Sequence, residues 1–194
     1  MDNNPKRTTY NRKHTIQEIR HQFIILYDKY GMEKLSVQQV CQQCGISRTI
    51  FYKYFDDKYS VLESIEDELI EGIRKINQRL PQTSLYDYKK GEPFPVFADT
   101  AKYIKSQEHF IKPLIGAHSD PQFIARWRRQ IRNDMELKFN SDNLQLKKQD
   151  LVTAVFASAI IGLYTYWFFE NPRLSADEIS TIAGNLLCGT LYDF

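Results

Sequence analysis

Two groups of residues in the first third of the sequence are suited to chemistry. The first is Cys41-Gln-Gln-Cys44, because a CxxC pair can form a thiol redox couple or half of a zinc site. A zinc site needs two more ligands at a matching spacing, and the nearby His14 and His21 belong to another predicted helix and offer no such pattern. Because buried cysteine also behaves as a small apolar residue, we expect both cysteines to be packing residues and predict no metal.

The second group is a basic and aromatic stretch that begins at Arg48. Ser47 is a good N-cap, so the first backbone N–H groups and the positive dipole end of the helix that follows would face outward as a phosphate seat. Residues 36–55 form two short predicted helices around Gly45, the layout of a DNA-binding helix-turn-helix. The side chains free to reach DNA would then be Arg48, Thr49, Tyr52, Lys53 and Tyr54.

Motifs of catalysis do not appear in the sequence. There is no glycine-rich phosphate loop, no HExxH and no GxSxG. The acids between Glu63 and Glu71 recur along one predicted helix as a solvated face, and His109 and His118 have no acidic partners in register. We therefore predict neither an enzyme nor a cofactor.

The elements that would position the basic stretch are all helices. Apolar residues recur three and four positions apart, and no segment alternates with the period of two that half-buried strands show. The pattern predicts an all-α fold of about nine helices, over residues 15–30, 37–43, 48–55, 58–80, 94–105, 108–117, 122–140, 150–170 and 175–191. The first three would enclose a small core of Ile19, Phe23, Tyr27, Val37, Val40, Cys41, Ile46, Ile50 or Phe51, and Phe55.

Composition and charge agree with a folded protein that meets a polyanion at one end. Of 194 residues, 42% are apolar and 26% charged, which excludes a disordered chain. Residues 1–60 hold ten basic against six acidic residues, while the remainder is slightly acidic. Three cysteines are no disulfide framework, and the N-terminal charges precede no apolar stretch, so we expect no signal peptide and a cytoplasmic location.

One uncharged segment, residues 151–169, has two readings. It is just long enough for a membrane span, but a helix buried on its own domain and on a partner subunit is equally apolar. Polar residues recur through it, so we favour the interface. Two DNA half-sites need two recognition helices and one chain has one, so we expect a homodimer joined by Leu151, Val155, Ile161 and Tyr164 with Ile179, Ile182, Leu186 and Leu187.

The stretch GMEKLSVQQVCQQCGISRTIFYKYFDDKYSVL resembles the N-terminal domain of the TetR family of bacterial transcriptional regulators. The resemblance implies a DNA-binding domain over residues 1–57 and a helical effector-binding and dimerisation domain over 58–194, with a loop at 81–93. It implies a homodimer that binds a palindromic operator and is usually released by a small ligand. Matching positions make Ser36, Arg48, Tyr52, Lys53 and Tyr54 DNA contacts and Lys58 a phosphate contact. Ile50 stands where the family commonly has threonine and cannot donate to phosphate.

The C-terminal part is similar to the TetR subset typified by the dihydroxyacetone kinase activator DhaS. Some members of that subset act through protein partners, so an adaptor is the alternative to a repressor with an unknown small-molecule effector. Six aromatic residues either line a ligand pocket or form ordinary core: Phe97, Tyr103, Phe110, Trp127, Phe156 and Tyr164.

Overall fold

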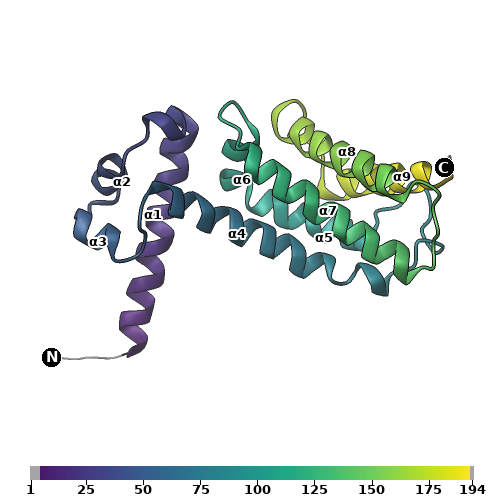
Figure 1. Ribbon diagram of the computed structural model, residues 1–194, viewed down its shortest axis with the longest axis horizontal. Coiled ribbons are helices and arrows are strands. Elements are labelled where there is room, and N and C mark those ends of the chain that lie inside the picture. Colours follow the sequence, from purple (N-terminus) through teal and green to yellow (C-terminus); the bar gives the residue numbers. More distant parts are fainter. Residues whose placement is uncertain (1–4, 193–194) are drawn as a thin grey trace. The chain divides into compact units, whose positions relative to one another are not determined.

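The computed structural model describes the backbone of residues 5–192 and the side chains of residues 12–189. Within this part the chain forms nine α-helices, one 3-10 turn and no strand, which confirms the predicted all-α class (Figure 1). The helices divide into two compact units, Met1–Glu68 and Leu69–Phe194. The fourth helix, α4 (Lys58–Asn77), begins in the first unit and ends in the second.

The first unit contains α1 (Pro5–Lys34), α2 (Val37–Cys44), α3 (Arg48–Tyr52) and the first part of α4. Gly31 interrupts α1 with φ 71° and ψ 167°, a conformation that favours glycine. The expected helix end at Gly31 is therefore confirmed, although the helix begins at Pro5 and not near Thr15. Its first turns carry charged and polar residues, which a search for apolar periodicity does not detect.

The core of the first unit forms where α1 to α4 meet. Phe23 and Phe51 are fully buried, and Tyr27 and Phe55 are nearly so. The sequence left Ile50 and Phe51 as alternatives for this core, and the structure places Phe51 inside and Ile50 on the surface, 42% exposed. Val37 and Ile46 are only half-buried.

The boundary between the units differs from the expected one at residue 57. Arg20 of α1 is buried, and its guanidinium donates to the Ser64 carbonyl oxygen at 2.7 Å and forms an ion pair with Glu68. Val61 and Ile65 are fully buried. The first part of α4 therefore belongs to the first unit.

The second unit packs helices in two pairs. In it α5 (Pro95–Ser106) lies along α9 (Ala176–Tyr192), α7 (Pro121–Ser141) lies along α8 (Gln149–Phe169), and α6 (Glu108–Ile115) is short. The predicted starts of α7 and α9 are confirmed: Asp120 Oδ1 accepts from the Gln122 N–H at 2.7 Å, and Ser175 and Glu178 form a reciprocal cap.

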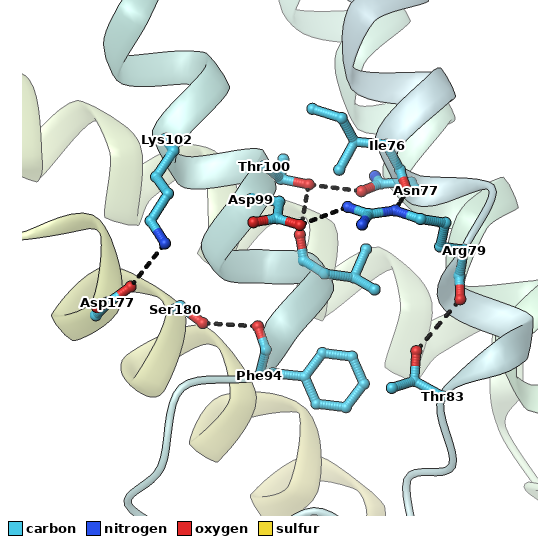
Figure 2. A network of polar contacts seen from close by, with 11 residues as sticks. Ile76, Asn77, Arg79, Thr83, Phe94, Asp99, Thr100, Lys102, Asp177 and Ser180 are labelled. Carbon is cyan, nitrogen blue, oxygen red and sulfur yellow. Dashed lines mark hydrogen bonds and ion pairs between the residues drawn. The ribbon is translucent and has the colours of Figure 1, made fainter.

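Polar contacts tie α5 to its neighbours (Figure 2). Thr100 Oγ1 donates to Asn77 Oδ1 of α4 at 2.7 Å, and Ser180 Oγ of α9 donates to the Phe94 carbonyl oxygen at 2.9 Å. At the surface Lys102 pairs with Asp177 at 3.4 Å. Thr100 and Ser180 are buried, so these bonds fix the register of α5 against both helices.

The loop over residues 81–93 is anchored to the second unit and does not link two domains. The 3-10 turn at Leu80–Gln82 leads into it, and the Leu85 N–H donates to Asp142 Oδ2 at 2.9 Å. Tyr88 Oη donates to Asn185 Oδ1 at 3.0 Å, and the Gly91 N–H reaches the same oxygen at 3.1 Å. The polar, proline-containing composition correctly indicated a loop, but it gives no sign of these anchors.

One helix of the described part, α8, is long and apolar enough to cross a membrane. Half of its most apolar window is buried inside the unit, where Trp167 and Phe168 are almost completely covered. The Trp167 indole N–H donates to the Leu174 carbonyl oxygen at 2.7 Å. These contacts are those of a core helix in a globular unit.

Candidate functional site

The hairpin between α2 and α3 is held by caps that the sequence predicts. Ser36 Oγ accepts from the Gln39 N–H, and Gln39 Oε1 accepts from the Ser36 N–H at 2.8 Å. Gly45 ends α2 in the left-handed region with φ 64°, so the chain can turn directly into the next helix. Ser47 Oγ accepts from the Ile50 N–H at 3.2 Å and starts α3.

Helix α3 has one buried anchor and an exposed outer face. Phe51 is fully buried and packs edge-on against Tyr52 and at a tilt against Phe55. Around that anchor the predicted DNA-contacting side chains are exposed, apart from Tyr54, which is half-buried: Ser47, Arg48, Thr49, Tyr52, Lys53 and Tyr54. The unit thus presents a short helix with two cations, two phenols and two hydroxyls, a set that can bind phosphates and base edges.

Two of the predicted contacts already have roles inside the fold. Lys58 Nζ donates to the carbonyl oxygens of Met32 at 2.7 Å and Leu35 at 2.9 Å, which leaves one N–H of the ammonium for another partner. The Ser36 hydroxyl donates to Gln39 Oε1 at 2.9 Å. Both residues therefore stabilise the turn between α1 and α2, in addition to any contact with DNA.

The two cysteines of the CxxC pair are free thiols. Cys41 is buried and Cys44 is half-buried with its Sγ 3.8 Å from the Glu18 carbonyl oxygen. Burial raises the pKa of both thiols, that of Cys44 to about 11. In the described part of the chain no three His, Cys, Asp or Glu side chains gather around a common point for a metal ion. The pair resembles packing residues more than a reactive couple.

The second unit encloses a cavity of about 30 Å³ between α4, α5, α7, α8 and α9. Four of the six predicted aromatic residues line it: Phe97, Trp127, Phe156 and Tyr164. Tyr103 and Phe110 do not, which corrects the predicted set. Tyr103 packs its ring on Gly72, where an added Cβ would lie 2.1 Å from the hydroxyl oxygen, and Phe110 lies at a tilt against the ring of His109.

Polar groups in this cavity were missed by sequence reasoning. Asp134 lines it and is 6% exposed. Its Oδ2 accepts from Asn77 Nδ2 at 2.7 Å, and its Oδ1 accepts from Gln130 Nε2 at 2.8 Å. A signal was present, because Asp134 continues the apolar stripe of Trp127 and Ile131 along α7 and so falls on its buried face.

The predicted dimer residues divide into two groups. Four are exposed on the surface of the unit: Leu151 and Val155 at 48% and 47%, and Ile182 and Leu186 at 38% each. The other four are buried inside the unit, which corrects their predicted place: Ile161, Tyr164, Ile179 and Leu187. They lie on the inner faces of the same helices. Both faces of these helices are apolar, so the sequence does not distinguish the inner face from the outer one.

Comparison with known proteins indicates the family in which this arrangement occurs. The family model described as "Transcriptional regulator C-terminal region", of the TetR series, matches residues 91–189, and the one described as "Bacterial regulatory proteins, tetR family" matches residues 25–65. No curated protein matches the chain in sequence.

Solved structures share the fold at low sequence identity. A TetR transcriptional regulator from Streptococcus agalactiae 2603V is 16% identical with a TM-score of 0.67, covering 95% of this chain and 99% of its own. A putative TetR-family regulator from Syntrophomonas wolfei is 16% identical with a TM-score of 0.68, covering 93% and 96%. The dihydroxyacetone kinase operon activator DhaS is 17% identical with a TM-score of 0.59, covering 93% and 97%.

The fold and the exposed helix after Gly45 define a helix-turn-helix transcriptional regulator. With the C-terminal model spanning half of the chain and the N-terminal model covering the hairpin, the protein belongs to the TetR family. This is a family of non-enzymatic regulators that bind DNA, form dimers and often respond to small molecules.

Proposed function

We propose that the protein is a cytoplasmic, homodimeric repressor that binds a palindromic operator through α3 and leaves it when a small molecule enters the second unit. The observation that carries this proposal is the construction of α3. Its buried Phe51 fixes the helix, while Arg48, Thr49 and Lys53 are exposed on the outside. A helix held in this way can enter a major groove without reorganising its own core.

Exposed apolar stripes support a dimer. On α8 the stripe runs through Leu151, Val155, Gly162, Tyr166 and Phe169, spaced as one face of a helix. An added Cβ at Gly162 would meet nothing within 4 Å, so a partner helix can approach closely there. On α9 the face through Ile182 and Leu186 adds to it. Joined to the same surface of a second copy, these residues would be covered by an apolar interface of the kind that obligate dimers have.

Helix α4 supports release by a ligand. Its first residue, Lys58, holds the carbonyl oxygens of Met32 and Leu35 ahead of the helix-turn-helix, and its last, Asn77, lines the cavity. A ligand that moves Asn77 therefore acts on the helix whose first residue supports the DNA-binding hairpin. An adaptor that acts through a protein partner is the second candidate, and the small cavity of about 30 Å³ favours it.

DNA binding is tested with the full-length protein and labelled genomic fragments at several salt concentrations. Specific retention is expected, and log affinity should fall with log salt by about 0.9 per neutralised phosphate. Arg48→Ala should abolish retention, whereas Lys89→Ala, which changes an exposed lysine of the second unit, should leave it intact. If the wild type retains no fragment even at low salt, the adaptor replaces the repressor.

A further inference from the structure

The cavity of the second unit combines aromatic walls with one buried acid. Trp127 and Tyr164 stack with ring centroids 5.4 Å apart, and Phe97 and Phe156 lie 6.1 Å apart. Asp134 is the acidic residue among the lining side chains, and none of the lining side chains is a lysine, arginine or histidine. The surroundings are therefore apolar and electron-rich.

The hydrogen bonds of Asp134 leave its charge uncompensated. Each carboxylate oxygen accepts one bond from a neutral amide, Asn77 on one side and Gln130 on the other, although a carboxylate can accept about four. Asn77 is fixed in this orientation because its own oxygen accepts from Thr100. The cation that acts on Asp134 from a neighbouring helix is Arg74 of α4, which is half-exposed and engaged with Glu71.

A buried carboxylate with no ion-pair partner costs stability, and an apolar side chain would fill this position at no such cost. Burial accordingly raises the pKa of Asp134 to about 6. A positively charged ligand group in the cavity beside the Asp134 carboxylate would remove that cost. The aromatic side chains that line the cavity would add cation–π attraction to the same group. The cavity thus offers a cation a carboxylate that has no ion-pair partner, together with aromatic side chains around it.

We propose that this cavity binds a small organic cation, a protonated amine on an apolar or aromatic body, with the ammonium at the Asp134 carboxylate and the body against Trp127 and Phe156. The inference deepens the proposed function, since it names the class of the releasing ligand. The same charge rejects carboxylates and phosphates, so the effector is not an organic acid.

The cavity is large enough for the ammonium group of the ligand as it stands. It can hold the rest of the ligand only after lining side chains move. Its volume of about 30 Å³ holds roughly two water molecules, enough for an ammonium group. The body must displace lining side chains, and Met135, which is unbranched and adaptable, is the one best able to move. Small ligands should therefore bind and large ones should not.

The test uses three monocyclic aromatic probes of similar size and different charge: benzylamine, benzyl alcohol and benzoate. Each is titrated into the full-length protein without DNA, at about pH 8 where Asp134 is ionised. Calorimetry measures affinity, and tryptophan fluorescence, to which Trp127 in the cavity lining contributes alongside Trp167, gives a second readout of binding. The variants are Asp134→Asn, which keeps the shape, and Glu136→Gln, which removes a charge from α7 outside the cavity lining.

We expect benzylamine to bind at least tenfold more tightly than benzyl alcohol and benzoate not to bind. Asp134→Asn should erase the preference for the amine, and Glu136→Gln should preserve it. Equal binding of the amine and the alcohol, tighter binding of benzoate, an unchanged preference in Asp134→Asn, or no binding of any probe at millimolar concentration would overturn the proposal. None of these results bears on operator binding, which the DNA experiment measures separately.

Discussion

Asp134 is a single residue that makes the stability of the second unit depend on pH. Burial raises its pKa from 3.8 to about 6, so between those values the folded state binds more protons than the unfolded state. The contribution of this residue to the free energy of unfolding therefore falls as pH rises from about 4 to about 6. Above about pH 6 the full cost of burying the ionised carboxylate is present, and it lowers the free energy of unfolding by up to about 3 kcal/mol.

Replacing Asp134 by asparagine should therefore stabilise the protein at neutral pH. Asn77 can still donate to the new side-chain oxygen, and Gln130, which is half-exposed, can turn its amide to accept from the new NH₂. We expect a gain of about 1–3 kcal/mol at pH 7 that shrinks toward zero near pH 4. Urea unfolding at both pH values measures it, and a gain of equal size at both would contradict the assigned titration.

Cys41 and Cys44 illustrate how the setting of a residue decides its chemistry. Burial raises the pKa of both thiols, so little thiolate exists at neutral pH. The double variant Cys41→Ala, Cys44→Ala should keep the affinity of the wild type for DNA and show no response to oxidant or chelator. Binding measured with and without hydrogen peroxide checks this, and an oxidant-triggered release that only the parent shows would restore a redox role.

At the scale of the element, Lys53 and Lys58 separate contact with DNA from support of the DNA-binding hairpin. Lys53 is exposed after α3, whereas Lys58 donates to two backbone carbonyl oxygens. Lys53→Ala should weaken DNA binding and leave the melting temperature unchanged. Lys58→Ala should flatten the salt slope by about one and also cost about 1–3 kcal/mol of stability.

Fluorescence anisotropy across salt concentrations and thermal melts measure both lysine effects. Lys75→Ala is the matched control, since Lys75 is an exposed lysine of the same helix α4. A salt slope unchanged in Lys58→Ala, together with a lowered melting temperature, would show that this lysine is structural alone.

Helix starts and stops were predictable because their signals are local. Ser36, Ser47, Asp120 and Ser175 each cap the helix that follows, and Gly31 allows the conformation that interrupts α1. The inner and outer faces of an apolar helix were not predictable. Ile161 and Val155 have similar side chains on α8, and only the packing of α7 and α9 decides that the first is covered.

The candidate site was predictable where it lies on the surface of the hairpin and unpredictable where it lies between distant segments. The exposed residues of α3 follow from one capped helix and its motif. The cavity needs Asn77, Thr100 and Asp134 to meet from three helices. The sequence indicates such long-range pairing only weakly, here by one acid, Asp134, on an apolar stripe of α7.

At the scale of the whole molecule, the exposed stripe on α8 leads to a prediction about assembly. Val155 is 47% exposed, so Val155→Asp should leave the subunit folded but place a carboxylate at the centre of the proposed interface. Sedimentation equilibrium should show a monomer, and affinity for DNA should collapse with every α3 residue intact. Ile161→Asp is unsuitable, because Ile161 is buried within the unit and its change would unfold the subunit.

Leu137→Asp is the matched control for assembly, since Leu137 is 60% exposed on α7 and is not part of the α8 stripe. It should remain dimeric and bind DNA as the wild type does. A Val155→Asp variant that sediments as a dimer, or a wild type that is a folded monomer at micromolar concentration, would refute the interface.

The division of α4 between the two units determines how this protein can be recombined. A fragment cut at residue 57, ahead of the helix, would lose Val61 and Ile65 and leave the buried Arg20 without Ser64 and Glu68. Exchange of DNA-binding modules between relatives should therefore succeed with crossovers near residue 68 and fail with crossovers in the preceding turn. For building chimeric regulators, the DNA-binding module therefore ends inside α4 and not at the start of that helix.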